Sequence, residues 1–212
     1  MQMTRQMFIV GVALTAAAFG LGSAPAQSGP RTGMKAPDFS VVNVDGKPQK
    51  LSDFAGKTVI LEWTNHECPY VRKHYNSTTM QMLQKDMTND GIVWLTVISS
   101  APGEEGYADA AKAKELTKSR DAAPSNVLLD PKGKMGRAYG AQTTPHMYII
   151  DAKGTLVYAG AIDNKPSASN SSLNGAKSYV RQAIAELKAG KPVSEAATKA
   201  YGCSVKYAPP TT

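Results

Sequence analysis

The chain has 212 residues, with 42% apolar and 19% charged side chains, which is the size and composition of one globular domain. This composition excludes a disordered, a collagen-like and a disulfide-dense chain. The net charge is +7, but the Lys and Arg residues are scattered and form no basic stripe interleaved with aromatic residues. We therefore expect no nucleic-acid partner.

The first 26 residues have the pattern of a signal peptide. Arg5 gives a positive start, residues 7–21 form an apolar run, and Ala24-Pro25-Ala26 supplies the small residues that precede cleavage. The run is shorter than the roughly 20 apolar residues of a membrane span, so we expect no stable membrane anchor. The prediction is a periplasmic or secreted protein cleaved after Ala26, and an uncleaved N-terminal anchor is the alternative.

The rest of the chain alternates strand and helix patterns. After a linker at 27–33, strands are predicted near 39–44 and 58–63, a helix at 69–87, a strand at 92–99, a helix at 107–119, a strand at 126–129 and a short helix at 134–139. A hairpin of strands 146–151 and 156–159 and a helix at 173–189 close the domain. A tail rich in Gly and Pro follows. This order predicts an α/β sandwich with a mixed sheet.

Two cysteines, Cys68 and Cys203, are present in the predicted mature chain. An even count in an oxidising compartment suggests a disulfide between them. The bond would be either a redox pair or a permanent link, which on the chain-entropy argument would stabilise the fold by roughly 5 kcal/mol. The two possibilities exclude each other, because a permanent link would silence Cys68.

Cys68 lies where a buried strand ends and a helix begins, with Pro69 at the first helical position. The unpaired N–H groups and the positive end of the helix dipole favour a thiolate there. Arg72 and Lys73, one turn further on, are expected to add positive potential. The alternative is an inert cysteine at a helix start.

Glu62 interrupts the apolar strand that precedes Cys68. Burial would raise the pKa of its carboxyl group and make Glu62 a candidate proton acceptor for a resolving thiol. It could instead pair with Lys57 or reach solvent at the end of the strand.

Three motifs mark the first part of the predicted domain: GMKAPDF at 33–39, DGK at 45–47 and LSDFAGK at 51–57. They resemble motifs of the thioredoxin-like redoxins, the group that includes the alkyl hydroperoxide reductase/thiol-specific antioxidant (AhpC/TSA) proteins. The resemblance extends from residue 33 to residue 187 and implies a three-layer thioredoxin-like sandwich with an N-terminal β-hairpin extension. We expect this domain at 34–189 and a separate tail at 190–212. The CPYV stretch at 68–71 and GCSVK at 202–206 also resemble an exported bacterial subgroup.

The resemblance assigns roles to individual residues. Cys68 corresponds to the attacking cysteine of Cys-x-x-Cys, and Val71 stands where thioredoxins have the second cysteine, so Cys203 is the only candidate for the resolving thiol within the chain. Thr144-Pro145 matches the cis-proline loop that faces the active cysteine and offers backbone hydrogen bonds to substrate; an ordinary trans proline is the alternative.

Two further residues follow from the same comparison. Pro69 is expected beside the bound substrate, and Glu62 matches the buried carboxylate beneath the thioredoxin disulfide.

The chain departs from the peroxiredoxin pattern of Pro-x-x-x-Thr-x-x-Cys. Asn65 occupies the Thr position and Leu61 the Pro position, and Pro145 stands about where peroxiredoxins have an arginine. Because groups that polarise a peroxide O–O bond are missing, fast peroxide reduction is disfavoured.

The sequence thus predicts an exported thiol–disulfide oxidoreductase, or thiol-dependent antioxidant. Its partners would be a thiol or disulfide protein and an external thiol reductant. The alternatives are a non-catalytic binding module with a structural disulfide and a slow thiol peroxidase acting on a hydroperoxide. His66, His74 and His146 could suggest copper, but the close cysteine pair of copper chaperones is missing. We expect no metal and no other cofactor.

Overall fold

The computed structural model describes residues 29–209, so the predicted signal peptide and the first two residues of the linker lie outside the described part of the chain. No helix within 29–209 is long and apolar enough to cross a membrane. The strands are β1 (Ser40–Asn43), β2 (Pro48–Lys50), β3 (Val59–Trp63), β4 (Val93–Ile98), β5 (Asn126–Leu129), β6 (Thr143–Thr144), β7 (His146–Ile150), β8 (Leu156–Gly160) and β9 (Cys203–Ser204). The helices are α1 (Pro69–Asn76), α2 (Thr79–Asn89), α3 (Ala110–Ser119), α4 (Lys134–Tyr139) and α5 (Tyr179–Lys188), with 3₁₀ turns at Leu51–Phe54 and Asn170–Leu173.

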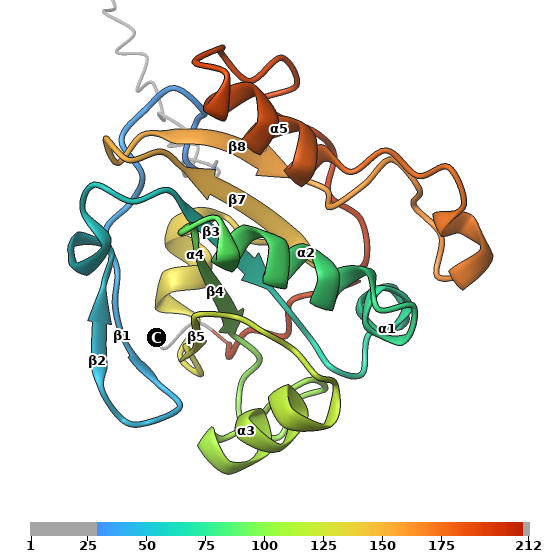
Figure 1. Cartoon of the computed structure of the whole chain (residues 1–212). Coiled ribbons are helices and arrows are strands. Elements are labelled where there is room, and N and C mark those ends of the chain that lie inside the picture. Colours follow the sequence, from blue (N-terminus) through green and yellow to red (C-terminus); the bar gives the residue numbers. More distant parts are fainter. Residues whose placement is uncertain (1–28, 210–212) are drawn as a thin grey trace, which may run out of the picture.

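Seven strands form one mixed sheet in the order β2-β1-β5-β4-β3-β7-β8 (Figure 1). The strands β3, β4 and β5 run parallel, and β7 joins β3 in antiparallel register. Every residue of β3 and β4 is buried, as expected of central strands covered on both faces. The hairpin β1–β2 extends the sheet beyond β5, which confirms the predicted N-terminal extension.

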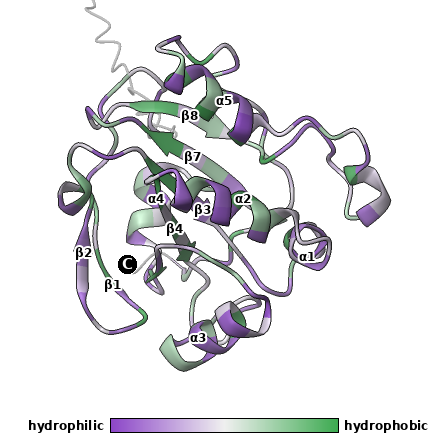
Figure 2. Ribbon diagram, viewed as in Figure 1, coloured by the Kyte–Doolittle hydropathy of each residue, from purple (hydrophilic) through white to green (hydrophobic). Residues whose placement is uncertain are grey.

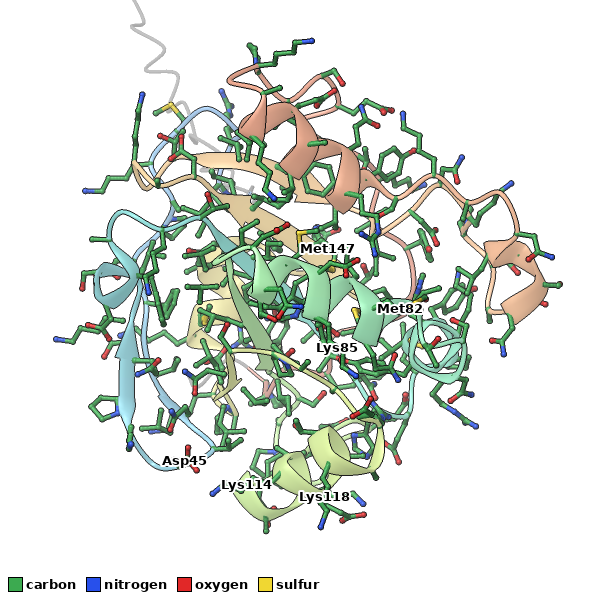
Figure 3. All side chains as sticks on the ribbon, in the orientation of Figure 1. Asp45, Met82, Lys85, Lys114, Lys118 and Met147 are labelled. Carbon is green, nitrogen blue, oxygen red and sulfur yellow. The ribbon has the colours of Figure 1, made fainter. Side chains whose placement is uncertain are left out.

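Helices cover both faces of this sheet and make three layers. On one face α1, α2 and α5 contribute Val71, Leu83 and Ile184 to a core shared with Trp94 and Met147. Met147 is labelled in Figure 3, together with Met82 on the exposed side of α2. On the other face α4 packs over the alternate residues of β3 and β4. The apolar strands between largely polar outer helix faces are visible in Figure 2.

The third core region lies beneath α3, at the β5 side of the sheet. Ala113 of α3 packs with Ile98 and Val127. Lys114, on the exposed side of the same helix, forms an ion pair of 2.7 Å with Asp45 in the turn between β1 and β2 (Figure 3). The helix therefore bridges the parallel strands and the N-terminal hairpin.

The single helix predicted over 69–87 is wrong, because the structure has two helices, α1 and α2. Thr78 between them adopts a left-handed conformation with φ of 62°. The hydroxyl of Ser77 donates to the carbonyl of Lys73 (2.7 Å), and that of Thr79 donates to the carbonyl of His74 (3.1 Å). These side-chain bonds compete with the helical pattern and end α1 after two turns.

Two other helices start later than the sequence predicts. Asp109 caps α3 by accepting from the backbone N–H of Lys112 (2.8 Å), and Ser178 caps α5 by accepting from that of Arg181 (3.3 Å). Both caps are residue types that favour this position. Because α5 starts later, the chain before Ser178 is a long loop. This loop carries Asp163, which belongs to the site described below.

The C-terminal tail folds back over the domain (red in Figure 1). It first follows β8, where Ala197 pairs with Ala159, and then reaches the strand β9, which pairs with β6. The backbone N–H of Ala101 donates to the carbonyl of Lys206 (2.8 Å) further along. The sequence analysis describes this tail only as a segment rich in Gly and Pro. In the structure it is ordered and docked on the domain.

Candidate active site

Cys68 lies just after β3 and forms the N-cap of α1, with Pro69 as the first helical residue. Its backbone N–H donates to the carbonyl (3.2 Å) and to the side-chain Oδ1 (3.3 Å) of Asn65, which fixes the turn between strand and helix. The strand–turn–helix context predicted for Cys68 is confirmed. Its side chain, however, has no exposed surface.

Two backbone groups make hydrogen bonds with the sulfur of Cys68. Its S–H donates to the carbonyl of Thr144 (3.2 Å), and the backbone N–H of Cys203 donates to Sγ (3.4 Å). The Thr144–Pro145 peptide bond is cis, so the expected trans alternative is wrong and this loop faces Cys68 as predicted. Residues 135 positions apart in sequence thus meet at one sulfur atom.

The strand β9 holds Cys203 in place. Thr144 pairs with Cys203 and Thr143 with Ser204 in antiparallel register. A Cβ atom on Gly202 would lie only 1.9 Å from the carbonyl oxygen of Thr144, and its φ is 134°, so only glycine fits there. The tail therefore covers the edge of the cis-proline loop that the resemblance assigns to substrate.

Both cysteines are free thiols in this structure, and Cys203 is partly exposed. Burial, followed by the hydrogen bond to Cys68 and the repulsion that an ionised Cys68 would exert, raises the pKa of Cys203 to about 12. The docked Cys203 is therefore protonated at neutral pH. It becomes a nucleophile only when its proton is removed or its surroundings change.

Glu62 is completely buried beneath the helices. One carboxylate oxygen accepts from the hydroxyl of Tyr75 (3.0 Å); the other accepts from Nε1 of Trp94 (2.9 Å), Oγ1 of Thr96 (3.1 Å) and Nε2 of Gln84 (3.1 Å). Burial raises the pKa of Glu62, and these four hydrogen bonds oppose the rise.

The expected alternatives, an ion pair with Lys57 or exposure at the strand end, are wrong. Among residues 29–209, the hydrogen-bond partners of Glu62 include neither Cys68 nor Cys203.

Lys73 does not add positive potential in the way the sequence suggested. Its side chain is fully buried, and Nζ lies 3.9 Å from Oδ2 of Asp163. It donates to the carbonyl of Lys165 (2.9 Å) and to the hydroxyl of Tyr201 (3.3 Å). We call Lys73, His74, Asp163 and Tyr201 the Lys73 cluster.

His74 is a second basic side chain in the Lys73 cluster. Its Nε2 atom lies 3.7 Å from Oδ2 of Asp163, and the side chains are 3% and 5% exposed. Burial, and secondarily the charge of Lys73, lower the pKa of His74 to about 4, although the carboxylate of Asp163 opposes this. At neutral pH the positive partner of Asp163 is therefore Lys73.

Sequence reasoning missed Asp163 and Tyr201 as site residues. Asp163 lies between the predicted hairpin and the last predicted helix, and Tyr201 lies in the predicted tail, one residue before the GCSVK motif. Their hydroxyl–carboxylate contact joins positions 38 residues apart, and Tyr201 meets Lys73 across 128 residues. No local pattern marks such contacts, and the only available signal was the position of Tyr201 two residues before Cys203.

The three histidines considered as copper ligands lie in different surroundings. His74 belongs to the Lys73 cluster, His146 stacks against Tyr148 with ring centroids 4.5 Å apart, and the carbonyl of His66 accepts from Arg120 (3.0 Å). Within residues 29–209, no group of three or more His, Cys, Asp or Glu side chains could hold a metal ion.

A mixed sheet with helices on both faces, a Cys-Pro helix start and a cis-proline loop facing the cysteine together define a thioredoxin-like redoxin. Residues 32–159 match the AhpC/TSA family, and the chain belongs to that family.

Relatives and solved structures agree with this assignment. The thioredoxin-like protein YneN of Bacillus subtilis is 28% identical over 140 residues, which cover 65% of this chain and 76% of YneN. An uncharacterized conserved protein from Geobacillus kaustophilus has a TM-score of 0.72 at 24% identity, covering 85% of this chain and 94% of that one. A hypothetical protein from Sinorhizobium meliloti has a TM-score of 0.71 at 20% identity, covering 86% and 98%. These two structures support the fold.

Proposed function

We propose that the protein is an exported thiol–disulfide oxidoreductase in which Cys68 is the nucleophile and Cys203 the resolving thiol. The proposal rests above all on the docking of β9, which aims the backbone N–H of Cys203 at the sulfur of Cys68. Membership of the AhpC/TSA family supports thiol chemistry, and the segment at 1–26 supports export.

The reaction proceeds through two thiol–disulfide exchanges. The Cys68 thiolate attacks one sulfur of a substrate disulfide, a mixed disulfide forms, and one substrate thiolate leaves. The Cys203 thiol then loses its proton and attacks the Cys68 sulfur, so that the second substrate thiolate leaves. The substrate gains two electrons, the protein is oxidised to a Cys68–Cys203 disulfide, and an external dithiol or two monothiols restore the free cysteines.

The surroundings of Cys68 support this sequence of steps. The carbonyl of Thr144 holds the S–H of the resting thiol, and while β9 is docked the N–H of Cys203 can stabilise negative charge on the same sulfur. Pro69, Thr144 and Pro145 would line the substrate once β9 moves aside. Because Cys68 is buried under the docked tail, substrate must reach it in a form of the protein with β9 displaced.

Glu62 is the proposed proton acceptor for the second exchange. Burial raises its pKa, which makes the carboxylate a stronger proton acceptor, but its contacts reach neither sulfur, so the proton would have to travel through an intervening group such as water. The Glu62→Gln variant tests this role: closure of the Cys68–Cys203 bond should slow by about 100-fold while attack by Cys68 is unchanged. Equal closure rates in parent and variant would remove Glu62 from the mechanism.

The decisive experiment for the proposed function uses oxidised glutathione and mass spectrometry. The reduced parent should form an internal disulfide and release two glutathione molecules. The Cys203→Ser variant should stop at a mixed disulfide on Cys68, and Cys68→Ser should give no internal bond and react far more slowly. If Cys203→Ser accumulates no mixed disulfide, or Cys68→Ser reacts as fast as the parent, the proposed function is wrong.

A further inference from the structure

The Lys73 cluster joins the helix of Cys68 to the tail that carries Cys203. Lys73 belongs to α1, whose N-cap is Cys68, while Tyr201 belongs to the tail two residues before Cys203. Asp163 comes from the loop after β8 and contacts both of them. The cluster thus connects the two halves of the cysteine pair through a third segment.

A buried ammonium group needs partners, because removing it from water costs several kcal/mol unless charge and hydrogen bonds compensate. The Nζ of Lys73 has three partners: the carboxylate of Asp163, the carbonyl of Lys165 and the hydroxyl of Tyr201. The same hydroxyl donates to Oδ1 of Asp163. The Tyr201 hydroxyl therefore supplies one hydrogen-bond partner to the Lys73 ammonium group and one to the Asp163 carboxylate. Undocking Tyr201 would leave each of these buried charges with one partner fewer.

Packing adds to these polar contacts. The Tyr201 ring meets that of Tyr70 with centroids 5.8 Å apart, and the Nζ of Lys73 lies 5.2 Å from the centre of the Tyr201 ring. Gly202 follows, pressed against the carbonyl of Thr144, and then comes Cys203. The freedom of Cys203 to move from Cys68 is thus limited directly by the anchoring of Tyr201.

A second anchor holds the tail beyond Cys203. The backbone N–H of Val205 donates to the carbonyl of Gln142 (2.9 Å), and the hydroxyl of Tyr207 donates to that of Ala141 (2.7 Å). Arg137 lies over the ring of Tyr207, 4.6 Å from its centre. Only the first anchor uses buried charges of the helix that begins at Cys68.

We propose that Tyr201 is a positioning residue: held by Lys73 and Asp163, it keeps Cys203 opposite Cys68 and so sets the effective concentration of the resolving thiol. This inference rests on the proposed function. Ordering a free tail costs conformational entropy, and this cost would oppose disulfide formation. The inference implies that the tail is already ordered in the reduced protein, so that the cost does not arise when the disulfide forms. It also implies that Tyr201 controls how often β9 moves aside and exposes Cys68.

The first test measures an equilibrium constant in the parent and in each variant. The reaction is that of the reduced protein with oxidised glutathione, which gives the internal disulfide and two reduced glutathione molecules. Tyr201→Phe keeps the ring but loses both hydroxyl bonds, and we expect its equilibrium constant for disulfide formation to fall about tenfold, with a larger fall in Tyr201→Ala. Tyr179→Phe is the matched control, because the Tyr179 ring packs against Tyr158 while its hydroxyl makes no hydrogen bond within residues 29–209. It should remain within about twofold of the parent. Parent-like constants in both Tyr201 variants would overturn the inference.

The second test does not need the disulfide. In a Cys203→Ser background, the rate of Cys68 alkylation by iodoacetamide reports displacement of β9. Adding Tyr201→Phe should raise that rate about tenfold, and adding Tyr179→Phe should leave it unchanged. If the alkylation rate does not rise, the inference is wrong even when the parent forms the disulfide. If it rises while the parent forms no disulfide with glutathione, the anchoring is upheld and the proposed function fails.

A thermal unfolding curve of each variant separates positioning from general loss of structure. A merely structural role would lower the unfolding midpoint without changing the alkylation rate under native conditions. Positioning predicts a faster reaction at Cys68 at temperatures well below the unfolding midpoint, where the fold is intact.

Discussion

Replacing Glu62 by Gln separates the energetic cost of its buried charge from the value of its hydrogen bonds. The carboxylate accepts from four donors, and the side-chain amide has only one acceptor oxygen. If that oxygen takes the position that receives Trp94, Thr96 and Gln84, the amide nitrogen faces Tyr75. The hydroxyl of Tyr75 then accepts instead of donating, so this bond reverses its direction and the hydroxyl proton of Tyr75 loses its acceptor.

The magnitude follows from this count and from the direction of the pKa shift. Relative to the charged carboxylate, leaving the buried Tyr75 hydroxyl proton without an acceptor costs about 1 kcal/mol. Burial raises the pKa of Glu62 in the folded protein, so the unfolded chain releases its proton at a lower pH than the native state. The parent therefore loses stability as pH rises from the unfolded value of about 4.3 up to the folded pKa, by at most about 1.4 kcal/mol per pH unit. The variant lacks this loss.

Urea unfolding of parent and Glu62→Gln between pH 4 and pH 8 measures the effect. At pH 4 the folded parent carries the protonated acid, whose O–H can face Tyr75 as the amide does, so the two proteins should differ by less than about 1 kcal/mol, and the variant should gain on the parent as pH rises. Other titrating groups, including His74, are common to both chains and cancel in the difference. A difference that stays constant with pH, or that changes in the opposite direction, would refute the account of Glu62 as a charge destabilised by burial.

Two further substitutions test the cluster and the tail. Asp163→Asn leaves the buried Lys73 ammonium without its counter-charge and should lower the free energy of unfolding in urea by about 3 kcal/mol at pH 7. Part of this loss should be recovered as pH approaches 10, because Lys73 can then fold uncharged. A loss below about 1 kcal/mol at pH 7 would contradict the proposed ion pair of Lys73 and Asp163. Gly202→Ala places a methyl group against the carbonyl of Thr144, so β9 should undock and the alkylation rate of Cys68 should rise about tenfold or more; a parent-like rate would show that the tail is not held at this point.

Much of the fold could be predicted because its signals are local. The continuous apolar runs of β3 and β4 mark central parallel strands, and the helix start at Cys68-Pro69 follows from the residue types there. The break between α1 and α2 was not predicted, because hydrophobic spacing continues through Thr78 while the side-chain bonds that end α1 depend on exact geometry.

The candidate site could be predicted only in part, because only some of its residues belong to local motifs. Cys68, Thr144 and Pro145 were identified from local motifs and are brought together in the structure. The role of Lys73 was misjudged because its orientation depends on Asp163, 90 residues later, and on the tail. The anchoring through Tyr201 is a property of three segments that meet only in the folded protein.

The central claim is that Cys68 and Cys203 exchange between thiols and a disulfide during the working cycle. The reduction potential of this pair, measured by trapping free thiols with an alkylating reagent across a series of thiol buffers, tests the claim most directly. We predict a value between about −270 and −120 mV, the range of catalytic thiol–disulfide pairs. A value below about −300 mV would mark a permanent structural bond and contradict the account.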